Sequence, residues 1–144
     1  MVLAVWVLMG CGTHQTSSGD TGLIKVLPHY LDKEGQHSDG PTLLHRDSHQ
    51  NRLIKNPELV HSIRYDVQWF GEGEVTLRLE LRSGKRDSNP IIKKRTLSAG
   101  LGFNHWSSID ISPEIYREFG QPYSWQVSLW RDKKMLDKRE SFLW

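Results

Sequence analysis

The chain has 144 residues, a length that fits one domain and can bury one modest hydrophobic core. Its 19 Lys and Arg nearly balance 17 Asp and Glu, so a general attraction to polyanions such as nucleic acid is not expected. Six Trp, four Tyr and four Phe exclude an intrinsically disordered chain, because disordered sequences are poor in aromatic residues. The composition therefore indicates a folded domain with polar loops.

The first eleven residues differ in composition from those that follow. Residues 2–9 form an uncharged apolar run, and Gly10 and Cys11 come directly after it. The run is too short to span a bilayer, which takes about 20 residues, but it has the length of the apolar core of a secretory signal. Cys11 is the single cysteine of the chain, so it cannot form a disulfide bond within it.

The motif Leu8-Met9-Gly10-Cys11 resembles the lipobox of bacterial lipoproteins. This resemblance implies a signal peptide at 1–10, cleavage before Cys11 and a diacylglycerol on its thiol. Residues 11–22 would then be the lipidated cysteine and a flexible polar tether. Gly12 follows the cysteine where an Asp would favour the inner membrane, so the resemblance implies the outer membrane. No Lys or Arg precedes Cys11, and a start codon upstream would supply the basic residues that such signals carry.

The folded domain is expected at 23–144. Its first strand is expected at Leu23–Leu27 and to end at Pro28, since proline lacks the backbone N–H that a sheet uses. Residues 43–55 carry leucine and isoleucine at helical spacing, and Asn56-Pro57 follows them. The spacing predicts a helix that ends before the proline.

From Ser62 onward, apolar and polar residues alternate with the period of half-buried strands. The alternation predicts strands at 63–69 and 75–81, joined by Gly71-Glu72-Gly73 as a hairpin connection. Further strands are expected at 91–99, 106–111, around 125–129 and at 136–144, with turns at 83–90 and 131–134. A short helix is expected at 113–119, with Ser112 as its cap and Gly120 at its end.

Six or seven short strands with polar turns predict an all-β fold. We expect a small antiparallel β-sandwich of immunoglobulin/fibronectin-like architecture with one or two short helices. The segment Tyr123-Ser124-Trp125-Gln126-Val127 weakly resembles the late strands of such domains. No pair of core cysteines exists for a true immunoglobulin domain.

Five of the seven histidines, His29, His37, His45, His49 and His61, fall between residues 29 and 61. On the predicted helix His45 and His49 are four residues apart and share a face, an arrangement that can ligate Zn²⁺ or Ni²⁺. A metal- or ligand-binding module in this segment is therefore the alternative hypothesis for function. Solvated surface histidines are the simpler interpretation, since no Glu follows His45 as in the metalloprotease motif.

The surplus of tryptophan suggests a binding surface. Trp69, Trp106 and Trp130 are candidate binding aromatics, because exposed aromatic side chains on a sandwich commonly contact proteins or sugars. The simpler interpretation is that the aromatic side chains cover the core of a small domain. Basic residues cluster at 82–86, 93–95 and 131–139. If those segments lie at one end, they would present a positive patch to anionic lipid headgroups or a cell-wall polymer; otherwise they serve as solubilising charge.

No motif for catalysis is found. Neither a Gly-x-Ser-x-Gly nucleophile motif nor a nucleotide-binding loop is present, and the paired acidic residues sit in predicted turns. We therefore expect no enzyme and no cofactor. The leading hypothesis is a lipid-anchored lipoprotein of the bacterial cell envelope, binding an envelope protein or cell-wall polymer and no nucleic acid.

Overall fold

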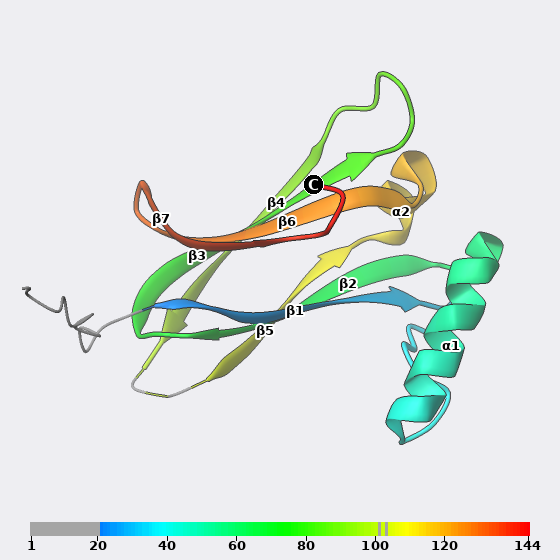
Figure 1. Ribbon diagram of the computed structural model, residues 1–144, viewed down its shortest axis with the longest axis horizontal. Coiled ribbons are helices and arrows are strands. Elements are labelled where there is room, and N and C mark those ends of the chain that lie inside the picture. The colour runs from blue at the N-terminus through cyan, green and yellow to red at the C-terminus, as the bar shows by residue number, and fades with distance from the viewer. Residues whose placement is uncertain (1–20, 101, 103) are drawn as a thin grey trace, which may run out of the picture.

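The computed structural model of the chain describes residues 21–100, 102 and 104–144. In this part of the chain, seven strands form two antiparallel sheets that pack face to face, one ordered β1-β2-β5 and the other β4-β3-β6-β7 (Figure 1). The strands are β1 (Gly22–Leu31), β2 (Ser62–Phe70), β3 (Gly73–Ser83), β4 (Ile91–Ala99), β5 (His105–Ile111), β6 (Pro122–Arg131) and β7 (Lys134–Glu140). The expected small all-β sandwich with short helices is confirmed.

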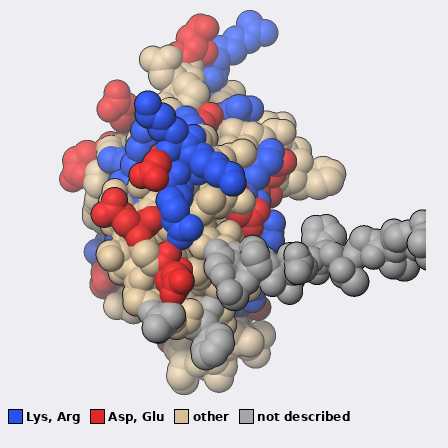
Figure 2. All heavy atoms as spheres, turned by 90° about the vertical axis from the view of Figure 1, so that its left-hand side faces the viewer, with Lys and Arg blue, Asp and Glu red and all other residues tan. Residues whose placement is uncertain are grey.

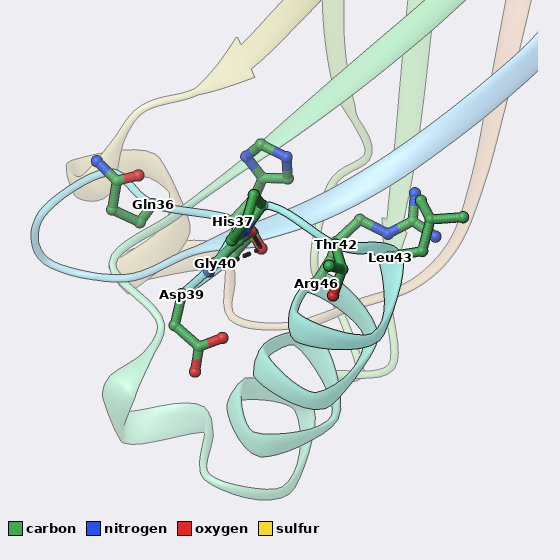
Figure 3. A pocket seen from close by; sticks show the side chains of 9 residues that line it. Gln36, His37, Asp39, Gly40, Thr42, Leu43 and Arg46 are labelled. Atoms are coloured by element: carbon green, nitrogen blue, oxygen red, sulfur yellow. Dashed lines mark hydrogen bonds between the residues drawn. The ribbon is translucent and has the colours of Figure 1, made fainter.

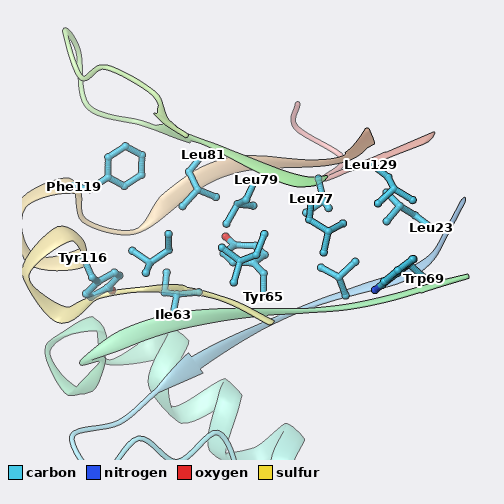
Figure 4. Packing of buried hydrophobic residues seen from close by; sticks show 14 of the residues in the cluster. Leu23, Ile63, Tyr65, Trp69, Leu77, Leu79, Leu81, Tyr116, Phe119 and Leu129 are labelled. Carbon is cyan, nitrogen blue, oxygen red and sulfur yellow. The ribbon is translucent and has the colours of Figure 1, made fainter. Parts of the chain in front are cut away.

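The core lies between the two sheets and follows the alternation of the sequence. In β2 and β3, every second residue points inward, and these side chains are almost fully buried. They are Ile63, Tyr65, Val67 and Trp69 on one sheet and Val75, Leu77, Leu79 and Leu81 on the other. Tyr116 and Phe119 close one end of this core (Figure 4). The alternation of apolar and polar residues in β2 and in β3 thus identifies the residues that each sheet contributes to the core.

The connection between β2 and β3 corrects one prediction. Gly71-Glu72-Gly73 does not close a hairpin, because β2 pairs with β1 and β5 while β3 pairs with β4 and β6. The segment instead carries the chain from one sheet to the other. Gly71 and Gly73 have φ values of 133° and 78°, in the region that favours glycine, which permits the abrupt change of direction.

Strand β1 also departs from the prediction, because it continues through Pro28 to Leu31. β1 is an edge strand, and Pro28 faces Tyr65 of its one neighbour, β2, in the register. The missing N–H of a proline is tolerated on an edge strand, where no second neighbour needs it. Proline does lack the backbone N–H that a central strand needs, but at the edge of the sheet this absence costs no inter-strand hydrogen bond.

Side chains cover the open edges of the three-stranded sheet. On β1, the Leu23 N–H donates to Asp137 Oδ2 at 2.9 Å and the Leu23 carbonyl accepts from Arg139 at 3.0 Å, both from β7 of the facing sheet. On the opposite side, Arg95 of β4 donates to the Ser108 carbonyl of β5. These contacts blunt edges that would otherwise offer free backbone groups for pairing.

The helices begin and end as predicted. Helix α1 (Leu43–Lys55) is capped by the Thr42 hydroxyl and is followed by a short 3-10 helix, η1 (Pro57–Leu59). Helix α2 (Pro113–Phe119) is capped by Ser112 and ends at Gly120, whose φ of 81° suits glycine. None of the helices among the described residues is long and apolar enough to cross a membrane.

The last strand is shorter than the predicted 136–144, since β7 ends at Glu140. The Ser141 N–H still donates to the Trp125 carbonyl at 2.9 Å, and the chain then turns, with the Trp144 N–H bonded to the Ser141 carbonyl. The turn places the Trp144 ring over the guanidinium of Arg82, with the Arg82 Cζ 3.8 Å from the ring centroid. A cation–π contact therefore replaces further pairing.

Candidate functional site

The histidine-rich segment is an insertion, residues 32–61, between the paired ends of β1 and β2. It consists of a loop, helix α1 and η1, and it lies at the end of the sandwich that also holds α2 (Figure 1). Helix α1 buries His49 and Leu53 against the fold. The Gln50 side chain accepts from the Tyr30 N–H and donates to the Tyr30 carbonyl, both at 2.8 Å. Gln50 thus substitutes for the missing neighbour of the β1 edge.

A polar cluster centred on Asp66 lies on the outer face of the three-stranded sheet. The carboxylate accepts hydrogen bonds from His29 Nδ1 at 2.9 Å and from the Ser108 hydroxyl at 2.5 Å. Arg64 Nε lies 3.0 Å from the same carboxylate. The register explains the grouping, because Asp66 of β2 faces Ser108 of β5, and the neighbouring Arg64 faces His29 of β1.

The electrostatics of the cluster favour a charged Asp66. Burial by itself raises the pKa of this carboxyl, but the hydrogen bonds from Ser108 and His29 and the charge of Arg64 outweigh it. The net result is a pKa below the usual range of an aspartate. The carboxylate therefore stays ionised and holds three strands and their side chains together.

His37, from the loop before α1, stacks over this cluster. Its ring centroid is 4.8 Å from that of His29, and its Nδ1 lies 3.4 Å from an Arg64 nitrogen. Burial, His29 and Arg64 lower the pKa of His37, in that order. The neutral form of His37 is thus the one that suits its contact with the sheet.

The cluster contains the residue types of a nucleophilic triad, but in another order. In such a triad the histidine lies between serine and aspartate, where it can take the serine proton. In this cluster Asp66 lies in the middle, and both Ser108 and His29 donate to it. The geometry therefore supports a role in joining the strands and the loop.

The two predicted metal ligands have different surroundings. His45 is exposed, and its Nδ1 lies 2.7 Å from the hydroxyl of Thr42, the helix cap. His49 is 2% exposed, and its Nδ1 accepts a hydrogen bond from Arg52 at 2.8 Å. The ring hydrogen is therefore on Nε2. This atom lies 3.2 Å from an Asp32 oxygen, but the N–H does not point directly at that oxygen.

No three His, Cys, Asp or Glu side chains are grouped to hold a metal within the described residues. The predicted pair of His45 and His49 thus finds no third ligand in that part of the chain. Of the five clustered histidines, His29 and His37 meet each other at the sheet, a pairing that the helical spacing of His45 and His49 does not reveal.

A groove of about 680 Å³ lies where the loop enters α1, and its lining is a continuous segment of the insertion. The lining residues are Gln36, His37, Ser38, Asp39, Gly40, Pro41, Thr42, Leu43 and Arg46. In Figure 3, His37 points toward the strands while Asp39 points away from them. Leu43 and the adjacent Leu44 are 68% and 75% exposed, so apolar surface borders the groove.

Two smaller hollows continue across the same end of the sandwich. One of about 390 Å³ lies between the Asp32–Glu34 loop and η1, and one of about 340 Å³ lies between η1 and α2. Both are lined by Glu58, Val60 and His61, so they adjoin each other. The insertion and α2 together give this end a concave surface with polar and apolar parts.

The candidate binding aromatics divide into core and surface. Trp69 is 2% exposed and its indole N–H donates to Ser107 at 3.1 Å, so it is not available to a partner and the prediction for this residue is wrong. Trp106 is 54% exposed. Trp130 is half-buried on the outer face of the four-stranded sheet, where its indole N–H donates to Ser128 at 2.8 Å.

Several residues of the site were not singled out by the sequence. The alternation of the sequence marks Asp66 and Ser108 only as polar residues of their strands, and no pattern marks Gln50. Outward polar residues on strands could have been paired only with the strand order, which the sequence does not provide. Cys11 and the signal motif lie outside the described residues.

Comparison with known proteins gives no relative. No protein-family model matches the sequence, and neither a curated protein nor a solved structure matches it significantly.

Proposed function

We propose that this protein is a lipid-anchored lipoprotein of the bacterial envelope that binds an envelope partner without catalysis. The observation that carries the proposal is that the two ends of the sandwich differ: the chain enters at one end, and the insertion with its grooves lies at the other. An anchor on Cys11 would hold the first end near the membrane. Gly12 after the cysteine favours the outer over the inner membrane.

The entry point is well defined in the structure. The Thr21 hydroxyl accepts from Arg131 at 3.2 Å, and a Cβ on Gly71 would meet Thr21 at 2.4 Å, so Thr21 is seated against the β2–β3 connection. From here β1 runs ten residues to the insertion, a length of about 30 Å at about 3.3 Å per residue. The candidate binding surface is therefore directed away from the anchor side.

The insertion end has the features of a binding surface. Leu43 and Leu44 are exposed next to the groove of about 680 Å³, and Leu59 is 47% exposed beside the hollow of about 390 Å³. Exposed apolar side chains with a polar rim commonly mark sites for a protein or polymer partner. The partner is proposed to be an envelope protein or a cell-wall polymer.

The anchor is tested by mass spectrometry of the N-terminus after expression in a bacterial host. We expect loss of residues 1–10 and a diacylglyceryl group on the Cys11 thiol. The Cys11→Ser variant should keep its N-terminal segment and lose membrane retention. An unmodified Cys11 in membrane-extracted protein would remove the basis of the proposal.

Binding is tested by crosslinking the acylated protein in intact cells. We expect a defined envelope partner that is lost in the Leu43→Ser/Leu44→Ser variant. Ile92→Ser is the matched control, because Ile92 is also exposed, at 48%, but lies on β4 away from the insertion. Equal loss of crosslinks in both variants, or retention in both, would contradict a partner at the groove.

A further inference from the structure

The positive charge of the chain is concentrated on one of the two sheets. The four-stranded sheet, with the β6–β7 turn, carries ten Lys and Arg against five Asp and Glu. The three-stranded sheet carries two of each, and the insertion at 32–61 carries four basic and five acidic residues. Although the net charge of the chain is only +2, the four-stranded sheet is basic and the three-stranded sheet is neutral.

The register places these basic residues on the outer face of the sheet. Lys94, Arg78, Ser128 and Lys138 are direct cross-strand neighbours, so one row of the face crosses all four strands. Lys133 and Lys134 lie at its edge, in and directly after the β6–β7 turn, where Lys134 pairs with Arg131 at the end of β6. We call Arg78, Lys94, Lys133, Lys134 and Lys138 the basic face. Figure 2 shows Lys and Arg side chains gathered at the end of the molecule that carries this turn.

Two of the acidic residues on this face, Glu80 and Glu140, are already paired. Glu80 lies 3.2 Å from Arg78 and 3.7 Å from Arg82, and Glu140 lies 3.0 Å from Lys138. Glu74 of β3 is a third acid on this face; it is exposed and forms no ion pair with any described residue. Asp132 in the β6–β7 turn and Glu72 at the β2–β3 connection are further acids at this end.

By contrast, Lys94, Lys133 and Lys134 are exposed and make no ion pair with any residue that the structure describes. Half-buried Trp130 lies on the same face, directly opposite Met135. Free lysines with an interfacial aromatic are suited to a surface of anionic headgroups.

The clusters predicted from sequence do not all join. The 131–134 turn lies at the entry end of the sandwich, whereas residues 83–86 follow the far end of β3, where Ser83 pairs with Pro122. The two basic turns are therefore at opposite ends, and the proposed single end patch is corrected to a sheet face. The far turn provides a natural control.

The chain enters the fold beside the basic face. Arg131, at the end of β6 next to Lys133, also bonds Thr21 at the start of the described chain. Thr21 is ten positions after Cys11 in the sequence, a length of chain that reaches about 35 Å when extended and about 17 Å as a flexible coil. A lipid on Cys11 would thus hold the β6–β7 turn within reach of the headgroups.

We propose that the basic face docks on the anionic phospholipid headgroups of the membrane that holds the anchor. This inference rests on the proposed lipid anchor and adds an orientation to it. The insertion packs against β1 of the other sheet, so docking on the four-stranded sheet leaves α1 on the side away from the bilayer (Figure 1). The domain would then lie on its four-stranded sheet instead of moving freely on its tether.

The test uses the full acylated chain in phosphatidylcholine vesicles with and without phosphatidylglycerol. Because Cys11 is the single cysteine and its thiol would carry the lipid, a second cysteine can be labelled selectively. Energy transfer to headgroup-labelled lipid is measured from Met135→Cys on the basic face and from Leu44→Cys on α1. We expect phosphatidylglycerol to raise transfer from residue 135 above that from residue 44, and high salt to reverse this.

The charge variants decide the cause. Lys94→Gln/Lys133→Gln/Lys134→Gln should lower the docked-to-free ratio about 100-fold, from three charges near an anionic surface. Lys33→Gln/Lys55→Gln/Lys85→Gln removes the same charge elsewhere and should keep the phosphatidylglycerol effect. Equal loss in both variants, or no effect of phosphatidylglycerol at residue 135, would overturn the proposal.

Retention in neutral vesicles reports the anchor by itself. If the protein is retained there but phosphatidylglycerol changes nothing, the basic face fails and the anchor stands. If it is not retained in neutral vesicles and Cys11 is unmodified, the anchor is what fails. Binding of a soluble anionic polymer to the basic face, together with no response to phosphatidylglycerol vesicles, would also overturn the membrane assignment.

Discussion

At the scale of single residues, Asp66 has the largest number of polar partners on the outer face of the three-stranded sheet. Asp66→Asn keeps the size of the side chain but removes the charge that Arg64 and His29 face. We expect the free energy of unfolding at neutral pH to fall by about 1–3 kcal/mol, the usual effect of losing hydrogen bonds to a charged group. Urea denaturation measures this, and Ser108→Ala, which removes one of the bonds, should lose less.

The same variant has a pH signature. The pKa of Asp66 is lower in the folded chain, so its contribution is present above the unfolded value of about 3.9 and is lost as pH falls through the folded pKa. The stability gap between the natural chain and Asp66→Asn should therefore be constant near neutral pH and narrow below about pH 4. A gap independent of pH in acid would contradict the ionised carboxylate.

Two tryptophans give a matched comparison of core and surface. Trp69→Ala leaves a cavity between the sheets and should cost about 3–5 kcal/mol, whereas Trp106→Ala should change stability by less than about 0.5 kcal/mol. Thermal or urea unfolding of both variants measures the difference. Similar losses of stability in the two variants would mean that the Trp106 side chain is packed in the folded protein and not exposed to solvent.

At the scale of elements, Gln50 joins helix α1 to the edge of β1. Gln50→Ala would leave the N–H and carbonyl of Tyr30 without their side-chain partner, at a cost of about 1–3 kcal/mol. Asn51→Ala, on the exposed side of the same helix, is the control. Urea denaturation should separate the two variants, and equal stability would show that water replaces Gln50 at this edge.

Local patterns predicted the elements well because they depend on neighbours in sequence. The predicted bounds of α1 and α2 follow from Asn56-Pro57, Ser112 and Gly120, and the alternation at 63–69 and 75–81 gives the core residues. The β2–β3 connection was not predictable, because a Gly-Glu-Gly segment suits a hairpin and a crossover equally. The prediction that the first strand ends at Pro28 was wrong for a similar reason, since only the strand order shows that this strand lies at the edge of the sheet.

The site was less predictable than the fold. Helical spacing placed His45 and His49 on one face, but the surroundings of His49 also depend on Asp32, which the tertiary fold brings to it. The Asp66 cluster needs the order β1-β2-β5 before its members can be seen as neighbours. Trp69 occupies an inward position in its own alternating strand, so the pattern already contained the reason for its burial.

At the scale of the whole molecule, the two ends of the sandwich differ in how they are built. The entry end is closed by backbone turns, whereas the far end carries an inserted helix. Such an insertion can bind a partner while the sheets keep their structure, because its own fold is held by a small set of contacts. Its stability relative to the sheets is therefore a property of functional interest.

We predict that the insertion opens separately from the sandwich. Its helix α1 buries His49 and Leu53, while Leu43, Leu44 and Ile54 remain exposed, so little apolar contact secures it. In native-state hydrogen exchange, α1 amides should open with a free energy at least about 1.4 kcal/mol below that of β3 amides, which is tenfold in exchange rate. Leu53→Ala should increase exchange in α1 further and leave the ranking of β3 unchanged. If α1 and β3 exchange with one common free energy, the insertion is an integral part of the cooperative core, and partner binding could not order it independently.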